Sequence, residues 1–166
     1  MLQSLSLYLL PSLLMVAAAS DALYLRIPNW LTILTALAFF PMALMTGMPM
    51  AELGWHVVAG LILFFVGFAF FQLRLFGGGD AKLMAAAGLW FGTAQLVPFL
   101  FYTVLAGGIL AAGVAFLSMV GLHLEMKAEE FSKKISGIKP SVPYGIALAA
   151  GGILALRDSW WLQVAG

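Results

Sequence analysis

The stretch 53–73, LGWHVVAGLILFFVGFAFFQL, decides the fold of this chain. It contains no Asp, Glu, Lys or Arg, and about 20 mostly apolar residues in a helix cross a hydrocarbon core about 30 Å thick. Four further stretches come close to this pattern: 5–25, 30–46, 96–122 and 142–162. A sixth, 81–91, is apolar but would make a helix of only about 16 Å, and we expect residues 92–95 to end it. The sequence therefore predicts an all-α, polytopic membrane helix bundle of six transmembrane segments with a short fourth segment.

The composition supports a membrane protein and excludes several other classes. Of the 166 residues, 63% are hydrophobic and 9% are charged, against roughly a quarter charged in a soluble domain. A soluble domain of this size could not bury so much apolar surface. The net charge of +1 gives no reason to expect nucleic acid as a partner, and the absence of Cys excludes disulfides, thiolate zinc sites and a Cys nucleophile. The length permits a single transmembrane domain, residues 1–166.

The basic residues orient the predicted bundle. Six segments place seven of the eight Lys and Arg residues on one side and leave Arg157 on the other; the seven are Arg26, Arg74, Lys82, Lys127, Lys133, Lys134 and Lys139. By the positive-inside rule this side is cytoplasmic and both termini lie outside, whereas five segments would lose the asymmetry. Residues 123–140 are predicted to form an amphipathic helix on the cytoplasmic interface, either as a tether or as a guide for a substrate.

Two acidic residues lie within segments that the apolar pattern predicts to be inside the membrane. Asp21 lies in the last turns of the first segment, and Asp80 heads the short fourth one. An ionised Asp near the centre of a span costs about 2.5–3.5 kcal/mol, so such residues usually mark a functional site. Asp80 could instead be a helix N-cap, and Asp21 could pair with Arg26 or Lys82. The predicted topology puts both carboxylates in the same half of the bundle, as an aspartyl protease or a proton pathway requires.

Three successive glycines, Gly77, Gly78 and Gly79, immediately precede Asp80. Glycine allows a close approach of the backbone to a neighbour, or a positive φ. The run matches neither a phosphate-binding loop nor a dinucleotide fingerprint. Because it is joined directly to an acid inside an apolar region, the run indicates a shaped catalytic loop.

Three motifs together resemble the type IV prepilin peptidases. Residues 77–80 fit the Gly-x-Gly-Asp signature of intramembrane aspartyl proteases, and Asp21 followed by residues 26–29 looks like the family's first-aspartate motif. Residues 139–145 are similar to its Pro-Tyr-Gly segment. The family's long forms carry paired Cys motifs and a methyltransferase activity. A chain without Cys that starts at the first segment resembles the short forms that serve Tad (Flp) pili, so we expect no methyltransferase activity.

This resemblance implies an enzyme, an aspartic endopeptidase that cleaves the leader of a prepilin on the cytoplasmic side after a Gly. It implies Asp21 and Asp80 as the catalytic pair and the bacterial inner membrane as the location. The other residues expected to bind substrate or shape the site are Arg26, Pro28, Asn29, Gly77, Gly78, Gly79, Lys82, Pro143, Tyr144 and Gly145. The partners expected are the pilin precursor and membrane lipid, and no cofactor is expected.

Alternatives from the same residues are a preflagellin-type peptidase, a proton-coupled membrane transporter subunit, and a non-catalytic assembly factor. A transporter would need polar access from both faces, and in the outer half the sequence offers only Glu52 and His56 for that role. His56 and His123 fall near segment ends without a third ligand candidate nearby, so we expect no metal site.

Overall fold

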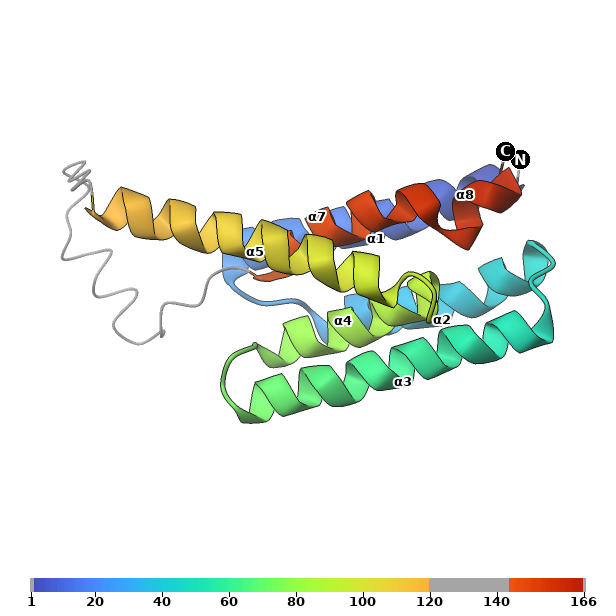
Figure 1. The fold of residues 1–166 in the computed structure, drawn as a ribbon, viewed down its shortest axis with the longest axis horizontal. Helices are drawn as coiled ribbons and strands as arrows, with labels where there is room; N and C mark the ends of the chain where they lie inside the picture. The colour runs from blue at the N-terminus through green and yellow to red at the C-terminus, as the bar shows by residue number, and fades with distance from the viewer. Residues whose placement is uncertain (1, 120–143, 166) are drawn as a thin grey trace.

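Helices are the secondary structure of residues 2–119 and 144–165, the part of the chain that this computed structural model describes. They are α1 (Leu2–Tyr24), α2 (Asn29–Met45), α3 (Met50–Gln72), α4 (Gly78–Phe91), α5 (Leu96–Met119), α7 (Tyr144–Ala155) and α8 (Trp160–Ala165), with a short 3-10 helix, η1 (Leu156–Asp158). The helices run side by side along one long axis, and the two termini lie at the same end (Figure 1). The all-α prediction is confirmed for the described residues.

The apolar helices are those of an integral membrane protein. In the described residues, three helices are long and apolar enough to cross a bilayer: Leu7–Tyr24 within α1, Met50–Gln72, and Leu96–Gly113 within α5. Two further apolar helices, α2 and α7, are shorter. The presence of six crossings remains a prediction, and the amphipathic helix expected at 123–140 lies outside the described residues.

The last predicted segment differs from the expectation of one continuous span over 142–162. The helix ends at Ala155, passes through η1 and restarts at Trp160. Ser159 is extended, with φ −80° and ψ 158°, and its hydroxyl donates a hydrogen bond of 2.8 Å to the carbonyl of Leu156. The uninterrupted span is therefore wrong. Local hydrogen bonding by a serine breaks the helix, while the apolar pattern continues on both sides.

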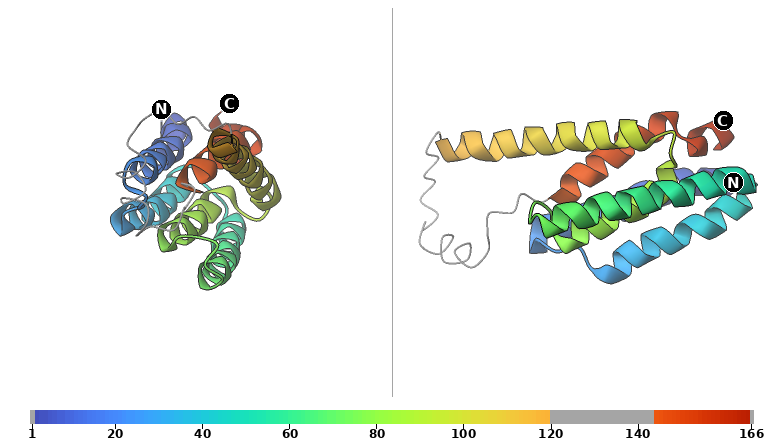
Figure 2. Two further views of the ribbon diagram at one scale, coloured as in Figure 1. Left: turned by 90° about the vertical axis from the view of Figure 1, so that its left-hand side faces the viewer. Right: turned by 60° about the horizontal axis from the view of Figure 1, so that its bottom comes forward.

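The short helix α4 also departs from its expected start. It begins at Gly78, three residues before the apolar stretch, and ends at Phe91. Gly92 follows with φ +63°, so the prediction that residues 92–95 end the helix is confirmed. A Cβ at residue 92 would also lie 2.8 Å from Nε2 of His56. Figures 1 and 2 show α4 ending part-way along the bundle, where the chain turns back into α5.

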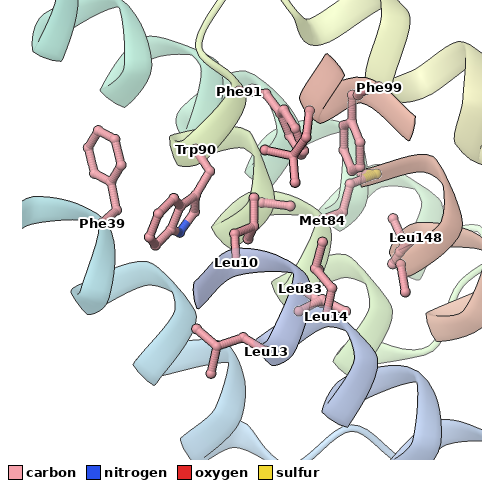
Figure 3. Close-up of a cluster of buried hydrophobic side chains, with 14 of the residues drawn as sticks. Leu10, Leu13, Leu14, Phe39, Leu83, Met84, Trp90, Phe91, Phe99 and Leu148 are labelled. Carbon is pink, nitrogen blue, oxygen red and sulfur yellow. The ribbon is translucent and has the colours of Figure 1, made fainter. Parts of the chain in front are cut away.

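Helix α4 forms the centre of the bundle. Most of its side chains are buried, and Leu83, Met84 and Trp90 belong to one apolar cluster that also includes Leu10 and Leu14 of α1 (Figure 3). Helix α3, by contrast, exposes large apolar side chains at Phe64, Phe65, Phe68 and Phe71. A surface this apolar is suited to lipid rather than to water. The fourth helix is thus enclosed by protein, which explains how it can be shorter than the bilayer is thick.

Hydrogen bonds from two indole N–H groups connect α2, α4 and α8 near the end of α4. Trp90 Nε1 donates to the carbonyl of Thr35 in α2 at 2.8 Å, and Trp161 Nε1 of α8 donates to the carbonyl of Trp90 at 2.6 Å. These bonds satisfy the polar edges of two large, fully buried side chains, as buried indoles require.

Helices α5 and α7 depend on glycine for their close approach. A Cβ at Gly151 would overlap Thr103 Oγ1 and lie 2.6 Å from the Thr103 backbone nitrogen, whereas nothing lies within 4 Å of the corresponding position at Gly108. Replacing Gly151 by Ala should therefore force the helices apart and lower the free energy of unfolding by about 1–3 kcal/mol.

Thermal unfolding in detergent micelles measures this effect, with Gly108→Ala as the matched control. We expect a lower melting temperature for Gly151→Ala alone. Equal melting temperatures for the two variants would contradict the close α5–α7 contact.

Candidate active site

Asp21 sits in the last turn of α1 and is only 5% exposed. Its Oδ2 accepts a hydrogen bond of 2.7 Å from the backbone N–H of Gly145, the second residue of α7. The first N–H groups of a helix have no partner within the helix, and their partial positive charge favours a carboxylate. A residue of α1 therefore caps the start of α7. The alternative ion pair of Asp21 with Arg26 or Lys82 is not seen among the described residues, where this backbone contact takes its place.

Asp80 is the third residue of α4, so the alternative reading of Asp80 as the N-cap is wrong: Gly77 occupies that position. Its Oδ2 accepts a hydrogen bond of 3.2 Å from the backbone N–H of Gly77. Its Oδ1 is buried and has no hydrogen-bond partner in the described residues. A buried acceptor without a partner is costly, so this oxygen is available to a water molecule or a substrate group.

The charges of the Asp21 and Asp80 carboxylates interact with each other. Asp21 lies close enough to Asp80 for their charges to repel each other. Two carboxylates whose charges repel each other do not both ionise readily. The arrangement can therefore present one acid and one base to the same bound molecule.

The neighbours of the glycines explain their spacing. A Cβ at Gly79 would lie 3.0 Å from Cβ of Ile27 and 3.2 Å from its carbonyl oxygen, and one at Gly77 would lie 2.8 Å from Oδ2 of Asp80. A Cβ at Gly78 would meet only the ring of Phe71, at an ordinary 3.4 Å. Gly79 thus lets α4 approach the loop after α1, and Gly77 leaves room for the Asp80 carboxylate, whereas the middle position tolerates a side chain.

Gly145 has the same function on α7. A Cβ there would lie 2.8 Å from Cβ and 2.9 Å from Oδ2 of Asp21. The N–H of residue 145 reaches the carboxylate only because no side chain stands between the two helices. This contact gives the Pro-Tyr-Gly segment a physical function at its last position; Pro143 lies outside the described residues.

The loop between α1 and α2 is fixed to its surroundings by polar contacts. Leu25 directly follows α1 and has a φ of +51°. The Ser20 hydroxyl donates a hydrogen bond of 2.8 Å to the carbonyl of Arg26. Pro28 is extended and precedes α2, as expected. Lys82 Nζ donates a bond of 2.9 Å to Oδ1 of Asn29. Lys82 and Asn29 therefore connect α4 to the start of α2, directly after this loop, while the Arg26 side chain is exposed.

Tyr144 contacts two other parts of the site. Its ring lies 4.6 Å from that of Phe76, centroid to centroid, and against the position of a Cβ on Gly107 of α5. Phe76 and Ile27 were not predicted as site residues from the sequence; Ile27 is 7% exposed and lies against Gly79. Both are apolar residues in an apolar chain, so no local pattern distinguishes them.

The described residues contain no group of three His, Cys, Asp or Glu side chains that could hold a metal ion. His56 lies on α3, and His123 lies outside the described residues. The chemistry available at this site is that of two interacting carboxylates, backbone N–H groups and one ammonium group on Lys82.

Comparison with known proteins shows the family of the chain. The model of the type IV leader peptidase family matches residues 8–112, more than half of the chain, a region that includes Asp21 and Asp80. Searches of curated proteins and of solved structures gave no match. Gly145 lies beyond the matched region, although it contacts Asp21 within the site. The chain belongs to the type IV leader peptidase family, and a peptidase activity follows from that membership.

Proposed function

We propose that this protein is a membrane-embedded aspartyl endopeptidase that removes the leader of a type IV, Flp-like prepilin, with Asp21 and Asp80 as its catalytic pair. The observation that carries the proposal is that two carboxylates from separate helices lie near enough for their charges to interact. One of them, Asp80, has a buried oxygen without a hydrogen-bond partner in the described residues. Family membership supplies the peptidase activity, and these carboxylates supply the chemistry.

In the proposed reaction, the ionised member of the pair takes a proton from water as the water attacks the peptide carbonyl. The protonated member donates a hydrogen bond to that carbonyl oxygen, and the pair then returns a proton to the leaving amine. Gly145 and Gly77 each donate one backbone N–H to a carboxylate and so fix its orientation. No cofactor takes part in these steps.

The substrate must present an accessible carbonyl. A helix keeps its carbonyls in internal hydrogen bonds, so the pilin precursor binds as a locally extended chain at the junction of leader and hydrophobic helix, where a Gly favours extension. The loops after α1 and α3 lie at the same end of the bundle as the site, opposite the termini (Figure 1), and hold Arg26 and Arg74. Cleavage therefore occurs on the cytoplasmic face of the bacterial inner membrane, by the positive-inside rule.

Replacing either Asp21 or Asp80 by Asn keeps the size of the side chain but removes its acid–base function. We expect cleavage of a membrane-inserted prepilin to fall by at least about 10³-fold in each variant. Gel analysis of the precursor and the shortened product after co-expression measures the loss. The amount of each variant in the membrane and its thermal unfolding serve as controls for folding. Undiminished cleavage by either variant would remove that aspartate from the mechanism.

The glycines provide a second, finer test. Gly79→Ala introduces a Cβ against the backbone of Ile27, so α4 and Asp80 must shift, and we expect cleavage to fall at least about tenfold, which corresponds to roughly 1.4 kcal/mol. Gly78→Ala adds the same methyl group at an ordinary contact distance and should change the rate less than about threefold. Initial rates of precursor cleavage compare the two variants. A larger loss in Gly78→Ala than in Gly79→Ala would contradict the contact that places Asp80.

A further inference from the structure

A polar cavity lies away from the carboxylate pair, where α4 is too short to fill the bundle. Its volume is about 290 Å³, and the residues that matter here are Glu52, Trp55, His56, Gly92, Thr93 and Trp160. They come from the first turns of α3, the turn between α4 and α5, and the start of α8. The cavity exists because the chain turns at Gly92 instead of continuing α4 along the bundle.

Glu52 and His56 are four residues apart on α3, so they lie on the same face of the helix. They are close enough to interact electrostatically. His56 is 5% exposed, and its Nδ1 lies 2.7 Å from the carbonyl of Leu89. A carbonyl only accepts, so Nδ1 donates and the Nε2 of the neutral ring is an acceptor. Residue 92 is a glycine, and a Cβ there would lie 2.8 Å from this Nε2, so the chain at residue 92 leaves the Nε2 edge uncovered.

The walls of the cavity suit a cation. Trp55 and Trp160 provide indole rings, which attract cations through their faces more strongly than other aromatic side chains do. The Glu52 carboxylate adds a negative charge, and no described residue that lines the cavity is Lys or Arg. An anion would therefore meet repulsion from Glu52 without any compensating charge.

The cavity lies at the level of the membrane surface, as the position of Glu52 along α3 indicates. Glu52 lies in the first turn of α3, a helix of 23 residues. Such a helix is about 35 Å long, so its first turn lies at the level of the lipid headgroups when it crosses the bilayer. Trp55 is 56% exposed at this level, where indole rings concentrate in membrane proteins.

We propose that this cavity binds a primary ammonium group. An ammonium has three donors, which match the Glu52 carboxylate and His56 Nε2, and a positive charge that the indole rings of Trp55 and Trp160 stabilise. Two sources supply this chemistry at the membrane surface: the ethanolamine headgroup of a phospholipid and a free alkylamine. The site is separate from Asp21 and Asp80, because the buried side chains of α4 lie between them.

Native mass spectrometry of the detergent-solubilised protein tests the lipid source, with phosphatidylethanolamine and phosphatidylglycerol of identical acyl chains as probes. Thermal unfolding with added ethanolamine, against equal sodium chloride, tests the free amine. We expect the wild-type protein to bind the ethanolamine lipid at least about tenfold more tightly than the glycerol lipid, to be stabilised by ethanolamine, or both.

Glu52→Gln should lower the affinity for the ethanolamine lipid, or raise the ethanolamine concentration needed for stabilisation, at least about tenfold. Trp55→Leu should also weaken this binding. Trp30→Leu, which removes an exposed indole from α2, is the matched control and should bind as the wild type does. Binding of the lipid alone identifies a headgroup site, and stabilisation by ethanolamine identifies a site for free amines. Binding that is absent in the wild type, or unchanged in both Glu52→Gln and Trp55→Leu, would overturn the proposal.

Discussion

The hydrogen bond from the Gly145 N–H to the Asp21 carboxylate, 2.7 Å long, joins residues 124 positions apart and determines the geometry of the whole site. It sets the start of α7 against the end of α1 and satisfies a helix N–H that has no other partner within its helix. It also explains why residue 145 is a glycine, since any side chain would occupy the position of the carboxylate. A buried carboxylate needs such a donor, because burial removes the water that would otherwise solvate it.

The short length of α4 has consequences at both of its ends. At its start, Gly79 lets the helix pack against Ile27 and Gly77 leaves room for the Asp80 carboxylate, which interacts electrostatically with Asp21. At its end, Gly92 turns the chain back and leaves a polar cavity beside His56. A helix that crossed the whole bundle would fill that cavity. Because protein encloses α4, its polar ends are not exposed to lipid, where unsatisfied backbone groups are costly.

The positions of the helices were predictable from the sequence, because long apolar stretches specify helices by composition alone. Asp21 and Asp80 were also recognisable as candidate site residues, since an acidic side chain in a membrane span costs free energy and usually has a function there. The break at Ser159 and the N-cap at Gly77 were not predictable, because local hydrogen bonds decide them within uniformly apolar or glycine-rich sequence. The contacts of Gly79 with Ile27 and of Gly145 with Asp21 join distant segments, and no local spacing encodes them.

The proximity of the two carboxylates can be measured by cross-linking. The chain has no cysteine, so an Asp21→Cys/Asp80→Cys variant carries only two thiols. A short bifunctional thiol reagent should join them within one chain and so prevent later labelling by a large maleimide, whereas an Asp21→Cys/Thr46→Cys pair should stay unlinked, because the length of α2 separates the end of α1 from Thr46, the C-cap of α2. Two freely labelled thiols in the first variant, as in the control, would contradict a shared site for Asp21 and Asp80.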